Sequence, residues 1–111
     1  MEVNNLFDKV SIISKDEYIE NILVTNNFKV ERIISRGHKS PDNFWYDQDC
    51  DEFVLLLKGN AELEFQEEKC ISLKPGDYLL IPAYKKHRVS RTSDAEDTIW
   101  LTIHFSERKL L

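Results

Sequence analysis

The feature that most restricts the fold of this chain is a pair of short strand patterns joined by only two residues. Residues 53–58 hold a run of consecutive apolar side chains, which is typical of a strand buried on both faces. Residues 61–66 alternate apolar with polar or charged side chains, as a strand with one solvated face does. The link Gly59-Asn60 opens with glycine and suits a primed hairpin turn. The two segments therefore predict a β-hairpin at the centre of the chain.

Further strand patterns lie on both sides of this hairpin. They are short apolar or alternating segments, at residues 28–34, 70–73, 78–81, 87–91 and 98–105. Turn residues separate them, most clearly at Lys74-Pro75-Gly76-Asp77, where proline suits the second and glycine the third position of a type II turn. Short strands at this regular spacing predict an all-β sandwich or barrel.

One helix is predicted ahead of the strands. Ser14 can cap it and Glu17 can reach back to complete a capping box. The apolar residues that follow fall on one face at helical spacing: Tyr18, Ile19, Ile22 and Leu23. We therefore expect residues 1–27 to form an N-terminal extension with a short helix, and residues 28–108 to form the barrel.

Length and composition limit the possible classes of protein. The chain has 111 residues, which suits a single domain. Its hydrophobic fraction of 41% and charged fraction of 32% are those of an ordinary soluble protein. A net charge of −5 disfavours attraction to nucleic acid or an anionic membrane. No signal peptide or spanning segment is evident, and two cysteines make no disulfide framework, so we expect a cytoplasmic protein with reduced thiols.

Two spaced motifs resemble those of the cupin superfamily. Gly76-x5-Pro82, with His87 five residues later, resembles the second cupin motif, G-x5-P-x-G-x2-H-x3-N. Two positions depart from that motif, because Tyr84 replaces the inner glycine and Arg91 replaces the final asparagine.

The end of the first cupin motif, G-x5-H-x-H-x3-4-E-x6-G, resembles the stretch from Glu52 to Gly59. The start of that motif departs, because neither spacing places a histidine ahead of Glu52. With three intervening residues the histidine positions hold Tyr46 and Gln48, and with four they hold Trp45 and Asp47.

The resemblance covers about residues 28–105 and is to small single-domain cupins of the cupin 2 conserved-barrel type. It implies an all-β double-stranded β-helix, or jelly-roll barrel, that is often a homodimer. It also implies a small-molecule ligand and a divalent transition metal, such as Zn, Fe, Mn or Ni, held inside the barrel by the motif histidines and glutamate.

Carried onto this sequence, the motifs imply Glu52 and His87 as site residues. One carboxylate and one imidazole are plausible ligands of a divalent first-row metal. Strand parity adds Gln48 as the third ligand, whereas a bulge would turn Asp47 inward instead. His104, on the closing strand, is a further candidate metal ligand. It could also be an ordinary strand histidine with no role in the site.

Aromatic side chains are expected around the same site. Tyr46 shares the parity of Glu52, and Trp100 shares a face of the closing strand with His104. We expect both to line a ligand pocket.

Two kinds of function agree with these features. The first is a metal-dependent enzyme of oxygenase, isomerase or lyase type that acts on a small organic molecule. The second is a metal-free binding or sensing module that performs no chemistry, because the same barrel can host either. The absence of the motif's histidine pair leaves the enzymatic status open.

Overall fold

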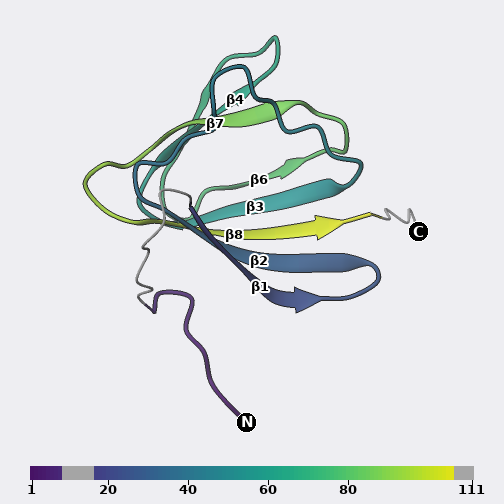
Figure 1. Cartoon of the computed structure of the whole chain (residues 1–111), viewed down its shortest axis with the longest axis vertical. Coiled ribbons are helices and arrows are strands. Elements are labelled where there is room, and N and C mark those ends of the chain that lie inside the picture. The colour runs from purple at the N-terminus through teal and green to yellow at the C-terminus, as the bar shows by residue number, and fades with distance from the viewer. Residues whose placement is uncertain (9–16, 107–111) are drawn as a thin grey trace.

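The chain folds into two antiparallel β-sheets that face each other (Figure 1). This computed structural model describes residues 1–8 and 17–106. The described strands are β1 Tyr18–Val24, β2 Phe28–Ser35, β3 Asp51–Lys58, β4 Ala61–Phe65, β5 Ile71–Leu73, β6 Tyr78–Ile81, β7 His87–Thr92 and β8 Thr98–Phe105. The larger sheet has the order β1-β2-β8-β3-β6 and the smaller one β5-β4-β7. The predicted all-β jelly-roll barrel is confirmed.

The central hairpin forms as predicted, with β3 and β4 joined through Gly59 and Asn60. Gly59 has φ +85°, and a Cβ added there would lie 2.7 Å from Thr98 Cα. Only glycine therefore fits this turn without strain. The predicted turn before β6 also forms: Gly76 has φ +92°, and Asp77 N donates to Lys74 O at 3.0 Å, as a type II turn requires.

The predicted N-terminal helix is wrong where the structure can test it. Residues 18–24 form strand β1, which pairs with β2 along its length. Residue 14, the expected helix cap, lies outside the described residues. The register shifts between Asn21 and Leu23, and a bulge of this kind breaks the period-2 pattern on which strand recognition depends. The apolar residues of β1 therefore fall at a spacing that is also typical of a helix.

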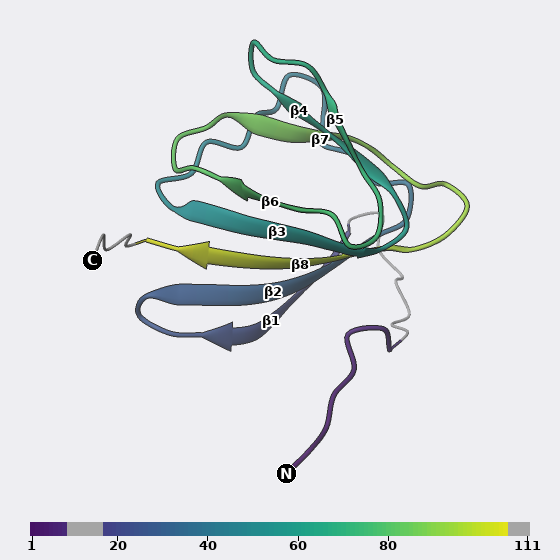
Figure 2. The same cartoon turned by 180° about the vertical axis from the view of Figure 1, so that it is seen from behind.

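The two sheets diverge on the side of β1 and β2. Both views place these strands farthest from the small sheet, while β3 and β6 lie nearest to it (Figures 1 and 2). The hydrophobic core fills the space between the sheets and consists of Val54, Leu56, Ala61, Leu63, Phe65, Leu73, Ile81 and Trp100. In the described part of the chain, we find no helix that could cross a membrane.

Candidate functional site

A cavity of about 200 Å³ lies between the two sheets. Residues from the large sheet and its N-terminal flank line one side of it: Glu17, Ile19, Glu31, Ile33, Glu52, Val54, Ile81, Trp100, Thr102 and His104. The other side is lined by Tyr46, Gln48, Leu63, His87 and Val89. The cavity thus contains Gln48, Glu52, His87, His104, Tyr46 and Trp100, all of which the sequence singled out.

Strand pairing explains why polar groups gather at one end of this cavity. On the inner face of β3, Glu52 lies beside His104 of β8, whereas Leu56, four residues on, lies beside Trp100. Side chains two residues apart share a face of the sheet, so β3 runs from a polar end of the barrel to an apolar end. Glu52 is buried among these walls, and His104 is partly buried.

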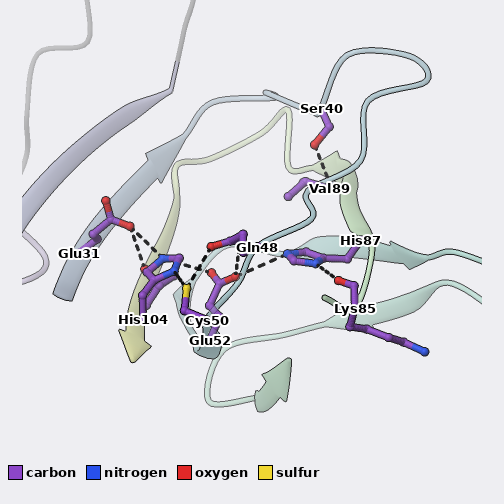
Figure 3. Close-up of polar contacts among 10 residues, drawn as sticks. Glu31, Ser40, Gln48, Cys50, Glu52, Lys85, His87, Val89 and His104 are labelled. Carbon is purple, nitrogen blue, oxygen red and sulfur yellow. Dashed lines mark hydrogen bonds and ion pairs between the residues drawn. The ribbon is translucent and has the colours of Figure 1, made fainter. Parts of the chain in front are cut away.

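His87 reaches Glu52 from the opposite sheet (Figure 3). Its Nε2 lies 3.5 Å from Glu52 Oε1, and its Nδ1 lies 2.8 Å from Lys85 O. A carbonyl oxygen can only accept, so Nδ1 carries a proton; Nε2 donates to Glu52 when the ring is protonated and presents a lone pair when the ring is neutral. Burial lowers the pKa of His87, but the hydrogen bonds to Glu52 and the Lys85 carbonyl raise it more, so the net shift is upward.

The segment ahead of β3 places Gln48 in the same contact. Gln48 Nε2 donates to Glu52 Oε1 at 3.3 Å. Backbone hydrogen bonds hold the segment: Tyr46 N donates to His87 O at 2.7 Å, His87 N donates to Tyr46 O at 3.2 Å, and Tyr84 N donates to Gln48 O at 2.7 Å. Tyr84, which stands where the cupin motif has glycine, keeps a left-handed φ of 65°. Asp47, the alternative ligand, is exposed.

Tyr46 lines the cavity next to His87. Its ring stacks on the His87 ring with centroids 5.4 Å apart. Burial, followed by the negative charges of Glu17 and Glu52, raises the pKa of Tyr46. The phenol therefore stays protonated at neutral pH and can donate a hydrogen bond to a bound molecule.

His104 lies on the other side of Glu52 and has two further partners. Its Nε2 is 3.1 Å from Glu31 Oε1 and 3.7 Å from Glu52 Oε2. A carboxylate only accepts, so the shorter contact places the proton on Nε2. The Nδ1 of the neutral ring then accepts from the thiol of Cys50, whose Sγ is 3.7 Å away.

Cys50 has a base beside it but not the acidity of a nucleophile. Burial and the charges of Asp49 and Glu52 raise the pKa of the Cys50 thiol. A raised pKa keeps the thiol protonated at neutral pH, and the thiolate is the reactive form. Cys50 is therefore best described as a hydrogen-bond donor whose single proton goes to either Gln48 Oε1 or His104 Nδ1.

Sequence reasoning missed two carboxylates of the cavity, Glu17 and Glu31. The pattern of β2 has apolar residues of both parities, at Val30 and Ile33, so alternation does not reveal which face turns inward. For Glu17, the sequence predicts a place in a helix cap instead of a place in the cavity. Glu31 faces the cavity because it pairs with Thr102 on the neighbouring strand. The sequence contains no signal for this pairing.

The donors around Glu52 fit a divalent first-row metal by chemistry, since they comprise an imidazole, a carboxylate and an amide. Within residues 1–8 and 17–106, no three His, Cys, Asp or Glu side chains are grouped to hold a metal ion. The third donor would therefore be Gln48. Its amide can present either oxygen or nitrogen by a flip, so its carbonyl oxygen can replace Nε2 beside Glu52.

Comparisons with known proteins agree with the fold. The family model described as Cupin domain matches residues 32–104. A solved structure from Ralstonia eutropha JMP134, provisionally named a mannose-6-phosphate isomerase, is 38% identical, with 96% of this chain and 99% of that chain covered and a TM-score of 0.90. Among curated proteins, none matches the sequence.

More distant structures share the fold alone. An RmlC-like cupin protein from Desulfovibrio desulfuricans is 20% identical, with 96% of this chain and 97% of that chain covered and a TM-score of 0.76. A cupin superfamily protein from Desulfitobacterium hafniense DCB-2 is 18% identical, with 88% of this chain and 84% of that chain covered and a TM-score of 0.72.

Proposed function

This chain belongs to the cupin family, and we propose that it binds a small organic molecule in the barrel cavity beside a divalent metal ion. The observation that carries this proposal is the meeting of Gln48 and His87 at one oxygen of Glu52, at 3.3 and 3.5 Å. The Lys85 carbonyl fixes the tautomer of His87 that leaves Nε2 available. A backbone carbonyl in this position is a common way to orient a metal-binding histidine.

Each site residue has a role in this proposal. Glu52, His87 and Gln48 would hold the ion, and His104 orders Glu52 from the far side. A bound divalent ion supplies Lewis-acid polarisation of a ligand oxygen. Tyr46 and Trp100 contribute cavity wall and, through the phenol, a hydrogen-bond donor to the organic molecule.

The provisional name of the Ralstonia eutropha structure suggests a phosphorylated sugar for that protein. The lining of this cavity does not favour such a molecule. It includes Glu17, Glu31 and Glu52, and among the described residues that line it there is no lysine or arginine. A phosphate group would be repelled by carboxylates and would find no cationic side chain there, so our proposal does not extend to a sugar phosphate.

A metal-free binding module is the second candidate. It is favoured by the contacts of the two imidazoles, because His87 and His104 already find carboxylates, a thiol and a carbonyl within the protein. In this form the cavity would bind its molecule through hydrogen bonds alone and perform no chemistry.

Metal analysis of the purified and metal-reconstituted protein separates the two candidates. We expect about one ion per parent chain, and none in Glu52→Ala or His87→Ala, because each removes a strong donor. His38→Ala is the matched control, since His38 lies in a loop and contacts the Arg36 backbone instead of the cavity. Circular dichroism of each variant verifies folding.

The outcomes are distinct. A folded parent that takes up no metal would leave the metal-free module as the function. Ion retained by both alanine variants would show that the metal lies elsewhere, and ion lost from His38→Ala would show that the assay reports stability rather than ligation.

We also propose that the protein is a homodimer. Strand β1 ends the large sheet, and its apolar side chains Ile19, Ile22, Leu23 and Val24 are exposed. Exposed apolar residues on an edge strand favour pairing with another chain. Light scattering across a dilution series tests this, with a monomer at all concentrations as the contrary result.

A further inference from the structure

We propose that Glu17 and Trp100 form a subsite for a cationic nitrogen of the organic molecule bound in the cavity. This inference rests on the proposed small-molecule binding and specifies the chemical class of the ligand. It gives Glu17, which stands just before β1, a role in recognition.

The three cavity carboxylates differ in the side chains that contact them. Glu52 contacts His87 and His104, and Glu31 contacts His104 and, at 3.6 Å, Lys29 Nζ. Glu17 differs, because within residues 1–8 and 17–106 it has no cationic partner in the structure and contacts the hydroxyl of Ser35. A carboxylate at a cavity wall without a counter-charge favours a cation from the ligand.

Glu17 is held in place by two buried residues. Trp100 Nε1 donates to Ser35 Oγ at 3.3 Å, and Ser35 Oγ donates to Glu17 Oε2 at 2.9 Å. Ser35 is fully buried, and Trp100 is almost so. The hydroxyl has one proton and two lone pairs, so both contacts are satisfied together. This chain of hydrogen bonds orients the carboxylate and leaves Oε1 able to accept from a ligand.

Trp100 lines the same part of the cavity as Glu17, and its indole N–H is engaged by Ser35. The indole therefore contributes wall beside the carboxylate. Ile19 and Ile33 line this part of the cavity as well, so they provide an apolar surface for the body of the ligand. The combination suits a small amine with an apolar group attached.

Three probes with the same ring test the charge preference: benzylamine, benzyl alcohol and benzoate. Binding is followed by titration of the Trp100 indole N–H resonance in 15N–1H spectra of the full chain, which Trp45→Phe assigns by removing the other indole signal. We expect benzylamine to bind at least about tenfold more tightly than benzyl alcohol, as a charge-assisted hydrogen bond provides, and benzoate to bind most weakly.

Two variants assign the preference to Glu17. Glu17→Gln is expected to remove the preference for benzylamine while leaving benzyl alcohol binding unchanged. Ser35→Ala, which removes the hydroxyl that orients Glu17, is expected to reduce the preference in part. Glu20→Gln is the matched control, because it removes a carboxylate three residues away that contacts Arg32 instead of the cavity.

Contrary results separate this inference from the function on which it rests. Equal binding of amine and alcohol, tightest binding of benzoate, or an unchanged preference in Glu17→Gln would overturn the cation subsite while supporting the cavity as a binding site. If none of the probes shifts the Trp100 resonance at saturating concentration, both the subsite and small-molecule binding at this cavity fail.

Discussion

Both ends of the barrel interior contain buried side chains, but the two ends differ in chemistry. Strand β3 passes through both: Glu52 lies at the polar end with a relative exposure of 9%, and Leu56 lies at the apolar end with 0%. Around Leu56, the side chains of Ala61 and Leu73 are also buried and apolar. Burial alone therefore does not identify a site. What distinguishes the polar end is that its buried groups are acids and imidazoles.

The polar end brings two carboxylates close together, which is unfavourable for the stability of the fold. Glu31 and Glu52 contact the same nitrogen of His104, which brings two acidic groups together in a buried place. Like charges in a buried site oppose folding unless a cation offsets them. The apolar end has the opposite character, since its side chains gain stability from burial and from mutual packing. The proposed metal ligands therefore gather at one end, and the closest apolar packing lies at the other.

The largest expected effect is at the apolar end. Leu56→Ala should lower the free energy of unfolding by about 2–5 kcal/mol, because it removes buried methyl groups and leaves a cavity. Leu80→Ala is the control, since Leu80 lies on β6 of the same sheet with a relative exposure of 47%. That variant should change stability much less, and urea denaturation measures both. Equal losses would mean that the apolar end is no better packed than the surface.

A smaller effect is expected at the polar end. Glu52→Gln should change the free energy of unfolding of the metal-free protein by less than about 1 kcal/mol, because the amide keeps the shape of the side chain and relieves the repulsion from Glu31. The same variant should lose metal. Urea denaturation in the presence of a chelator gives the first quantity. A loss as large as that of Leu56→Ala would show Glu52 to be a structural residue and would remove the contrast between the two ends.

Sequence reasoning recovered the apolar end and most of the strands because their signals are local. Apolar runs, alternation and turn residues depend on neighbouring positions, and the strands β2 to β8 lie where these patterns indicated, within one or two residues. The spacing of Glu52, Gly59, Gly76 and His87 predicts that residues from distant strands share one site. In the structure, the Glu52 carboxylate and the His87 imidazole lie 3.5 Å apart.

The remaining features depend on pairing that no local pattern contains. The bulge in β1 gave that strand a helical spacing, and so Glu17 was assigned to a cap instead of the cavity. Glu31 faces inward because β2 pairs with β8 in one particular register. A shift of one residue would turn Val30 inward in its place. The choice between Gln48 and Asp47 similarly follows from the contact between the backbones of Tyr46 and His87.

The smallest effect concerns the turn that joins β5 to β6, at the apolar end. This turn contacts Leu56, which donates through its N–H to Asp77 O at 3.0 Å. Lys74 N donates to Asp77 Oδ2 at 2.9 Å, and Lys74 Nζ lies 3.3 Å from Oδ1. The backbone hydrogen bond from Lys74, with a smaller contribution from its side chain, holds the pKa of Asp77 below its ordinary value of 3.8.

A lowered pKa in the folded state fixes the sign of the pH dependence. The ionised carboxylate stabilises the fold above the pKa of the unfolded chain, and this contribution disappears as the pH falls through the folded-state pKa. The difference in stability between the parent and Asp77→Asn should therefore be constant near neutral pH and shrink below about pH 4, as urea denaturation at a series of pH values would measure. Asp42→Asn is the control, because Asp42 is exposed and lies 4.0 Å from Arg88. A difference for Asp77→Asn that stays constant down to pH values where the fold is lost would mean that the turn depends on the shape of this side chain and not on its charge.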